Sequence, residues 1–271
     1  MLNKKIGFIG SGKMAEAIIG GLIKSELVPA NQIFASAKTR ETVEKIADKY
    51  AIQTTIQNRE VAAKADMLIL AVKPDLHKAV IEEIKDIVKS EAVIITIAAG
   101  ITLDFLETTF AKNIKAVRVM PNTPSLVGEG MSAICANDEI NAQELQEVIR
   151  LFESFGKAEV LPEKLMDAVP AVSGSSPAYV YMFIEALADG AVQQGIARNQ
   201  AYTMAAQAVL GAAKMVLETG KHPGELKDNV CTPGGATIEA VTTLEKHGFR
   251  SAVVSAMEAC TEKSKRLKNS K

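Results

Sequence analysis

The 271-residue sequence has few cysteines, almost no net charge and no long apolar run. Its three cysteines (Cys135, Cys231 and Cys260) are odd in number and lack the paired spacing of a metal site. They predict a reduced, cytoplasmic protein without a metal. The formal net charge of -1 gives no electrostatic reason to expect nucleic acid or an anionic membrane as a partner. No apolar run is long enough to span a bilayer.

The N-terminal residues predict a dinucleotide-binding unit. Ile6–Ile9 have the pattern of a buried parallel strand, and Gly10, Ser11 and Gly12 form the turn into a helical pattern. Gly10 permits the tight turn, Gly12 lets the backbone approach a pyrophosphate, and Ala15 allows close packing of helix on strand. The exposed N–H groups at the helix start suit a phosphate. The alternative is a tight turn that binds no ligand.

The residues after the second predicted strand, Gln32–Ser36, favour NADPH. A protein that prefers NAD usually has Asp or Glu about 20 residues past the glycine turn, where it binds the ribose hydroxyls. This chain has Ser36-Ala37-Lys38-Thr39-Arg40, with no carboxylate before Glu41. Hydroxyls and two cations suit a 2′-phosphate, although NADH stays possible. The alternative is that Lys38 and Arg40 are only solvated residues at the start of the next helix.

Strands and helices alternate regularly over residues 1–162, which predicts a Rossmann-like, doubly wound parallel sheet. Three predicted strands end in rigid or small residues: Met67–Val72 before Lys73-Pro74, Ala92–Ile97 before Ala98-Ala99-Gly100, and Ala116–Met120 before Pro121-Asn122-Thr123-Pro124. Ligands of open α/β sheets bind at the carboxyl ends of the strands, so we expect these turns at the ligand edge. The small residues after the second of these strands could admit a flat ring.

Residues 163–271 are predicted to form an all-α second domain. Its long helices are expected over Pro177–Gln194, Asn199–Glu218, Ala236–Lys246 and Gly248–Lys268. The segment Ala205–Val216 is apolar on nearly every face, which in so small a domain predicts dimerisation. The alternative is a crowded core within the domain.

A turn between these helices, Thr232-Pro233-Gly234-Gly235-Ala236-Thr237, could present N–H groups and hydroxyls to a small anion. The alternative is an ordinary connector with a helix cap. The three histidines, His77, His222 and His247, show no pairing with a carboxylate or cysteine, and we expect all three to be surface or cap residues.

Together these motifs resemble the pyrroline-5-carboxylate reductases, the last enzymes of proline biosynthesis, over essentially the whole chain. The segments that carry the resemblance are Gly7–Ala15, Ala71–Pro74, Ala98–Gly100, Met120–Pro124, Asp167–Val169, Ser173–Tyr179 and Thr232–Thr237. The first is generic to dinucleotide folds. The last two, in this order and spacing, are specific.

The resemblance implies reduction of the C=N bond of 1-pyrroline-5-carboxylate to L-proline by NADPH or NADH. It also implies homodimers, formed through the helical domain, that gather into larger homo-oligomers. The implied cofactor-binding residues are Ile9, Gly10, Ser11, Gly12, Lys13, Met14, Ser36, Ala37, Lys38, Arg40, Asn58, Ala71, Val72, Lys73, Pro74, Ile97, Ala98, Ala99 and Asn122. The implied substrate pocket comprises Glu163, Asn229, Thr232, Gly234, Gly235, Ala236 and Thr237, with Thr237 as the catalytic residue.

Two other functions are alternatives. The β-hydroxyacid dehydrogenases share both domain types, but they need a proton donor, usually a lysine near the start of the first long helix of the second domain. Between Gly174 and Ala191 this chain has no Lys, Arg or His. A non-enzymatic NADP-sensing protein would need only the nucleotide-binding half, and the Thr232–Thr237 turn argues against it.

Overall fold

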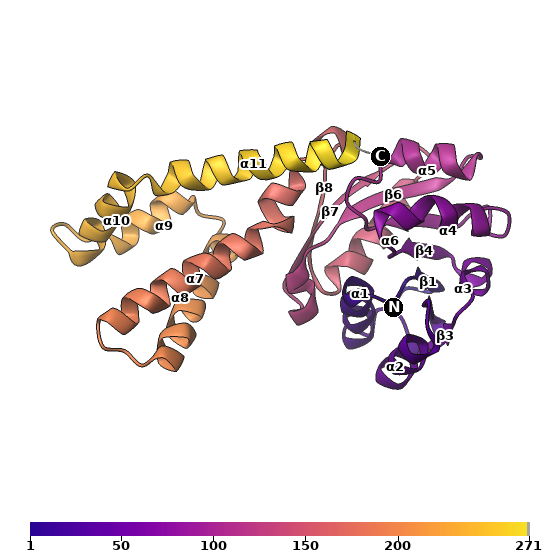
Figure 1. The fold of residues 1–271 in the computed structure, drawn as a ribbon, viewed down its shortest axis with the longest axis horizontal. Helices are drawn as coiled ribbons and strands as arrows, with labels where there is room; N and C mark the ends of the chain where they lie inside the picture. Colours follow the sequence, from indigo (N-terminus) through magenta and orange to yellow (C-terminus); the bar gives the residue numbers. More distant parts are fainter. Residues whose placement is uncertain (270–271) are drawn as a thin grey trace. The chain divides into compact units, whose positions relative to one another are not determined.

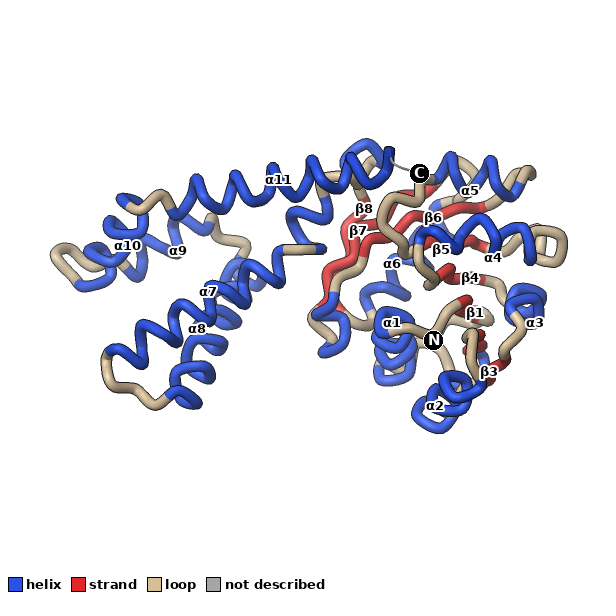
Figure 2. The backbone as a smooth tube through the Cα atoms, in the orientation of Figure 1, coloured by secondary structure: helices blue, strands red, loops and turns tan. Residues whose placement is uncertain are grey.

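A computed structural model gives the fold of residues 1–269, with side chains described for residues 1–266. One eight-stranded sheet has the order β3-β2-β1-β4-β5-β6-β7-β8 (Figures 1 and 2). Its strands are β1 (Ile6–Ile9), β2 (Ile33–Ser36), β3 (Gln53–Thr55), β4 (Met67–Leu70), β5 (Val93–Thr96), β6 (Lys115–Met120), β7 (Gly130–Ala136) and β8 (Gly156–Val160). Strands β1–β6 are parallel, β7 is antiparallel to β6, and β8 is parallel to β7. The predicted Rossmann-like fold class is confirmed.

Helices cover both faces of the sheet, because successive residues of a strand point to opposite faces and both sets are apolar here. On one face, Phe8 and Ile69 pack in one cluster with residues of α1 (Lys13–Lys24), α2 (Arg40–Tyr50) and α6 (Ala142–Glu153). On the other face, Leu68 and Ile94 pack with residues of α3 (Asn58–Lys64), α4 (His77–Ile84) and α5 (Leu103–Phe110). The double winding is therefore dictated by strands that are apolar on both sides.

The carboxyl ends of four strands stand level. Ile9 pairs with Ser36 on one side and with Leu70 on the other, and Leu70 in turn pairs with Thr96. The chain runs outward from β1 to β2 and β3, and then returns to place β4 on the opposite side of β1. This reversal opens a crevice beyond the ends of β1 and β4, which is where ligands bind in such sheets.

Two glycines allow other segments to approach β1 closely. A Cβ at Gly7 would lie 2.8 Å from the Cβ of Ala65 and 2.9 Å from Cγ1 of Val61, which pack against the strand. At Gly10 the backbone has φ of +96°, and a Cβ would lie 2.7 Å from the carbonyl oxygen of Ala71. Any larger residue at Gly10 would meet both backbone strain and a clash.

Strands β7 and β8 lie beyond the strands predicted from the sequence. At their first residues Gly130 and Gly156 stand opposite each other, and a Cβ on Gly156 would clash with the Gly130 carbonyl. In the sequence these glycines suggest a loop, but in the structure they allow β7 and β8 to pair. A 3₁₀ turn, Pro74–Leu76, precedes α4, which ends at Ile84.

Residues 175–260 form a second compact unit, separate from the other described residues. It contains α7 (Ser176–Gln193), α8 (Arg198–Thr219), α9 (Pro223–Val230), α10 (Ala236–Lys246) and most of α11 (Phe249–Asn269). The predicted long helices agree with α7, α8, α10 and α11, whereas α9 was not predicted. The domain boundary after residue 162 stays a prediction, and residues 270–271 of the predicted second domain lie outside the described residues.

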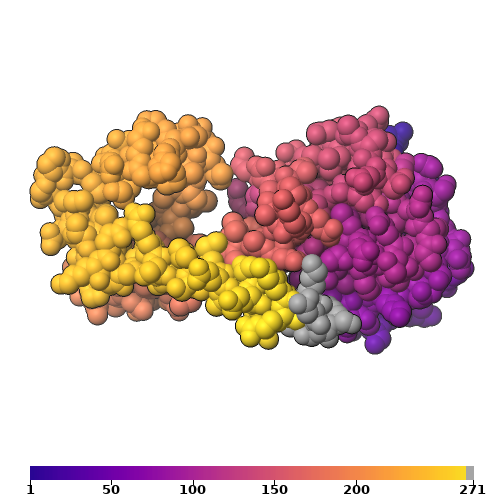
Figure 3. Space-filling view, turned by 90° about the horizontal axis from the view of Figure 1, so that it is seen from above, coloured from indigo at the N-terminus to yellow at the C-terminus, as the bar shows by residue number. Residues whose placement is uncertain are grey.

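The helices α7 and α8 bury little of their apolar surface within this unit. Large side chains are exposed, including Met182 (69%), Met204 (59%) and Leu210 (52%), whereas the fully buried residues of the two helices are the alanines 188, 201 and 205. Figure 3 shows the unit in orange to yellow, with a hollow between its helices. Apolar surface on this scale marks an interaction site, so the structure favours a partner subunit over a crowded internal core.

Within residues 1–269, no helix combines the length and the apolar character needed to cross a membrane.

The exposed apolar face of α8 generates a first prediction. Replacing Leu210 with Glu would place an unpaired charge in the predicted interface, so the variant should dissociate or unfold. Size-exclusion chromatography with light scattering measures the assembly. The control Gln57→Glu adds the same charge beside the exposed start of α3 and should leave the assembly intact. A wild-type protein that runs as a stable monomer would contradict the interface.

Candidate functional site

The glycine turn is anchored to the ends of β2 and β4 by its backbone. The N–H of Gly10 donates to the Ser36 carbonyl at 3.1 Å, and the Ser11 hydroxyl donates to the same oxygen at 3.0 Å. On the other side, the N–H of Ala71 donates to the Ile9 carbonyl at 2.8 Å. These bonds continue the parallel ladder past the strand ends and hold the turn rigidly at the crevice.

The start of α1 fits a pyrophosphate group. Gly12 is its N-cap and supplies no side-chain cap, so the N–H groups of the first turn point outward. A Cβ built at Gly12 meets no protein atom within 4 Å, which shows open space in front of the helix. Ala15, by contrast, is 1% exposed and packs against the sheet. An uncapped helix start facing open space favours an anion on physical grounds.

The end of β2 combines a buried serine with two exposed cations. The Ser36 hydroxyl donates to Oδ1 of Asn58 at 2.8 Å, and Nδ2 of Asn58 donates to Glu83 at 2.8 Å. Lys38 and Arg40 are exposed, and neither forms an ion pair with any side chain of residues 1–266. The positive charges of Lys38 and Arg40, which were predicted to suit the 2′-phosphate, are therefore not balanced by ion pairs. The Ser36 hydroxyl, by contrast, points inward.

The turns after β4 and β5 hold the residues predicted to lie along the ribose and the nicotinamide. Lys73 and Ala99 are exposed, and Ala98 is buried. A cavity of about 830 Å³ touches both turns, at Pro74 and Gly100. The structure thus brings Ala71–Pro74 and Ile97–Ala99 to one edge with the glycine turn.

The prediction that all three histidines are surface or cap residues is wrong for His77. His222 caps α9 by accepting from the Gly224 N–H at 3.0 Å, and His247 ends α10. His77 instead is fully buried, with Nδ1 3.1 Å from the Lys73 carbonyl and Nε2 3.0 Å from the Thr96 hydroxyl. Helical spacing from His77 to the buried residues Val80, Ile81 and Ile84 is the signal that could have revealed its inward direction.

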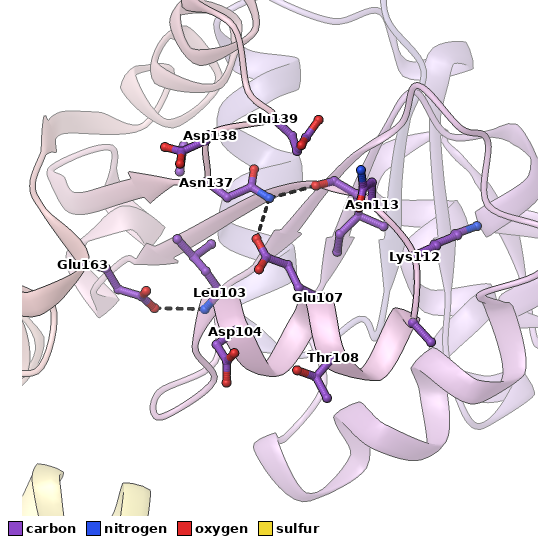
Figure 4. Close-up of a pocket in the computed structure, with 13 residues that line it drawn as sticks. Leu103, Asp104, Glu107, Thr108, Lys112, Asn113, Asn137, Asp138, Glu139 and Glu163 are labelled. Atoms are coloured by element: carbon purple, nitrogen blue, oxygen red, sulfur yellow. Dashed lines mark hydrogen bonds between the residues drawn. The ribbon is translucent and has the colours of Figure 1, made fainter.

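Glu163, predicted to bind substrate, belongs to an ionic network around the buried Arg118. Figure 4 shows its carboxylate beside the Leu103 N–H. Its Oε1 accepts from the Leu103 N–H at 2.9 Å and lies 3.4 Å from Nη1 of Arg118. Nη2 of Arg118 donates to Asp167 at 3.2 Å. Arg118 is 6% exposed, so its charge depends on these two carboxylates. The sequence analysis missed Arg118, although a cation in the middle of the otherwise apolar run Ala116–Met120 was a signal for it.

Figure 4 also shows a cavity of about 880 Å³ beside α5 and the amino end of β6. It is lined by acidic residues that include Asp104, Glu107, Asp138 and Glu163. This position is away from the crevice beyond β1 and β4. Among the described residues, no group of three or more His, Cys, Asp or Glu side chains could hold a metal ion.

Two further residues lie near Arg118: Asn122 follows it closely in the sequence, and Cys135 stands opposite it on the neighbouring strand. Asn122, predicted to contact the cofactor, is 8% exposed, and its amide donates to the Ser173 carbonyl and accepts from the Met131 N–H, each at 2.9 Å. Cys135 pairs with Arg118 across β6 and β7. Burial, aided by the Glu163 carboxylate, raises the pKa of the Cys135 thiol to about 11, so the thiol stays protonated.

The other predicted substrate residues lie in the helical unit and meet in one turn. The Thr232 carbonyl accepts from the Gly235 N–H at 3.0 Å, and Gly234 has φ of +69°, as in a type II turn with Pro at its second position. Gly235 is the N-cap of α10 and supplies no side chain, and Thr237 is the second helical residue. Asn229 lies in the last turn of α9.

Comparisons with known proteins cover both units. Residues 163–267 match the family model described as pyrroline-5-carboxylate reductase dimerisation, and residues 5–100 match the one described as NADP oxidoreductase coenzyme F420-dependent. The chain is 49% identical over 269 residues to the pyrroline-5-carboxylate reductase of Escherichia coli (strain K12), which covers 99% of this chain and 100% of that protein.

Solved structures agree. A pyrroline-5-carboxylate reductase from Coxiella burnetii matches with a TM-score of 0.93 and 34% identity, over 98% of this chain and 99% of that one. The Plasmodium falciparum pyrroline carboxylate reductase, solved with NADP bound, matches with a TM-score of 0.86 and 35% identity, over 99% of both chains.

The uncompensated cations after β2 generate the second prediction. Replacing Lys38 and Arg40 together with Ala should weaken NADPH binding roughly 10- to 100-fold and leave NADH nearly unchanged, because only NADPH carries the 2′-phosphate. Fluorescence titration measures both dissociation constants. A matched double variant, Lys24→Ala with Lys157→Ala, removes the same charge elsewhere. Equal losses for the two cofactors would contradict the phosphate assignment.

The buried guanidinium generates the third prediction. Arg118→Met removes the guanidinium that Glu163 and Asp167 both face, and both carboxylates are partly solvated. We therefore expect the free energy of unfolding to fall by about 2–3 kcal/mol, below the roughly 3–5 kcal/mol typical of fully buried pairs. Urea unfolding at fixed protein concentration measures it, with the exposed Arg150→Met as control. Unfolding midpoints that coincide for Arg118→Met and the wild type would show that the network adds no stability.

Proposed function

Because the chain belongs to the pyrroline-5-carboxylate reductase family, we propose that it reduces the C=N bond of 1-pyrroline-5-carboxylate to L-proline. It is an NADP-dependent oxidoreductase by that membership. The observation that carries the proposal is that the likeness spans both the nucleotide-binding sheet and the helical unit. The same membership argues against the β-hydroxyacid dehydrogenase and the NADP sensor.

We propose that NADPH is the preferred cofactor. The uncapped start of α1, at Gly12, Lys13 and Met14, would receive the pyrophosphate. Lys38 and Arg40 would supply the positive charge for the 2′-phosphate. Because the Ser36 hydroxyl donates to Asn58, we assign both residues to shaping the loop around the adenosine ribose. A related reductase from Plasmodium falciparum has NADP bound, which supports this choice.

The turns Ala71–Pro74 and Ile97–Ala99 would flank the ribose and the nicotinamide. The reduced nicotinamide, when bound, supplies the hydride for the C=N carbon. The protein's part is to provide a wall of small residues, at which Ala99 is exposed and Ala98 packs beneath it, and to hold it still. Asn122 would act by fixing the backbone at Ser173 and Met131.

We propose that the turn Thr232–Ala236 binds the substrate carboxylate. Ala236 and Thr237 begin α10, where N–H groups lack helical partners and favour an anion, whereas the Gly235 N–H already donates to the Thr232 carbonyl within the turn. Thr237 would hydrogen-bond the ring nitrogen, whose basicity rises as the double bond is lost. Its hydroxyl is a weak acid, so its role is orientation and proton relay to water. An imine needs no stronger acid, because its nitrogen can carry the proton itself.

The remaining substrate residues would act at the border of this pocket. We propose that Asn229 contacts the substrate from the last turn of α9. Arg118 and the Leu103 N–H would hold the Glu163 carboxylate in the position from which it acts at this border.

We propose that the protein is a homo-oligomer built from dimers through its helical unit. The exposed apolar side chains of α7 and α8 support this assembly, as does the match to a dimerisation family. We also propose a cytoplasmic location, which is supported by three cysteines that are all free.

The chemistry generates the fourth prediction. Thr237→Ala should lower kcat roughly 5- to 150-fold, because the lost hydrogen bond strengthens as the ring nitrogen is reduced. NADPH affinity should stay unchanged, and Thr237→Ser should recover most of the rate. Oxidation of NADPH with pyrroline carboxylate measures turnover, and Thr242→Ala is the control on the same helix. If Thr237→Ala were as fast as the wild type, Thr237 would be only a helix residue.

A further inference from the structure

The backbone ladder between β4 and β5 stops at the level where the predicted cofactor turns begin. Leu70 and Thr96 are the last paired residues of the two strands. The next bond, from the Ile97 N–H to the Leu70 carbonyl, is already 3.5 Å long. Beyond it, the turns Ala71–Pro74 and Ile97–Ala99 follow separate paths, so their relative position depends on other contacts.

A buried side-chain relay connects these two turns. His77, the first residue of α4, reaches back to the Lys73 carbonyl with Nδ1 and across to the Thr96 hydroxyl with Nε2. The Thr96 hydroxyl in turn accepts from the N–H of Ala98 at 3.3 Å. His77 and Thr96 are both fully buried, so water does not compete for these bonds.

The donors and acceptors of the relay assign one tautomer. The Lys73 carbonyl can only accept, so Nδ1 of His77 carries the proton and donates to it. Nε2 is then an acceptor, and the Thr96 hydroxyl donates to it. The same hydroxyl is left free to accept from the Ala98 N–H. All the polar atoms of the relay are matched only when the imidazole is neutral with its proton on Nδ1.

We propose that His77 is a positioning residue that joins the turn after β4 to the turn after β5, so that the two form one wall for the nicotinamide end of the cofactor. This inference rests on the proposed cofactor site. His77 touches neither substrate nor cofactor in the proposal. It acts through the Lys73 carbonyl on one side and through Thr96 and the Ala98 N–H on the other.

The relay can be cut on either side. His77→Asn keeps a donor near the position of Nδ1 but does not reach Thr96, and His77→Gln can reach Thr96 but loses the bond to Lys73. Thr96→Val removes the hydroxyl at nearly constant shape, whereas Thr96→Ser keeps it. Lys78→Ala, at the exposed neighbour of His77, is the matched control.

Two ligands separate a local effect from a general one. Fluorescence titration with NADPH reports the whole cofactor site, and competition by 2′,5′-ADP reports the adenosine end alone. We expect His77→Asn, His77→Gln and Thr96→Val each to weaken NADPH roughly three- to tenfold. The affinity for 2′,5′-ADP should stay within twofold of the wild type, and Thr96→Ser and Lys78→Ala should bind both ligands normally.

The double variant of His77→Gln with Thr96→Val supplies a further test. Because both residues act in one relay, its loss of NADPH affinity should be smaller than the product of the two single losses. Nitrogen NMR of the three histidines should show an Nδ1-protonated ring whose signals vanish in His77→Gln. An Nε2-protonated ring would overturn the assigned tautomer.

The proposal fails if folded His77 and Thr96 variants bind NADPH as tightly as the wild type. It also fails if they lose NADPH and 2′,5′-ADP equally, since that is the mark of general loosening. These measurements need no turnover. A wild-type protein that binds NADPH but does not reduce pyrroline carboxylate would therefore overturn the proposed function. The binding test of the positioning role of His77 would still be valid.

Discussion

The level register of β1, β2, β4 and β5 is the constraint on which the rest of the nucleotide-binding unit depends. Ile9, Ser36, Leu70 and Thr96 stand side by side, so the turns that follow them emerge together at one edge. This arrangement needs a glycine at position 10, because a side chain there would clash with the carbonyl oxygen of Ala71. Backbone groups, not side chains, would therefore build the phosphate end of the proposed site, and they are rigid because they extend the sheet.

Where the strand pairing ends, buried polar side chains hold the following segments in position. Asn122 ties the start of β7 to the segment at Ser173, Arg118 ties β6 to Glu163 and Asp167, and His77 ties the turns after β4 and β5. Each of these groups is costly to bury alone and stable only when every polar atom is matched. Such groups position loops more strictly than apolar contacts can, since a hydrogen bond depends on both distance and direction.

The helical unit differs from the nucleotide-binding unit in how its apolar residues are buried. Its helices α7 and α8 expose large apolar residues and bury alanines, so one copy does not complete a core of its own. In the proposed dimer, folding and assembly of this unit would be linked, because the interface would supply the burial that the single chain lacks. The Thr232–Thr237 turn is carried by this unit. Its shape depends on local features, Pro233 and a left-handed Gly234, that need no partner.

Sequence alone determined the elements whose signals are local. The glycine turn, the apolar strands β1, β4 and β5, the long helices and the Thr-Pro-Gly-Gly turn follow from periodicity and from residues with special backbone preferences. The cations at Lys38 and Arg40 could be placed as well, because they follow a predicted strand directly. Only the tertiary structure decided the pairing of β7 with β8, the inward turn of the Ser36 hydroxyl, the capture of Glu163 by Arg118 and the choice of Thr96 as the partner of His77. The partners of these groups lie 19 to 45 residues away along the chain, and no local pattern encodes which distant atom a polar side chain will meet.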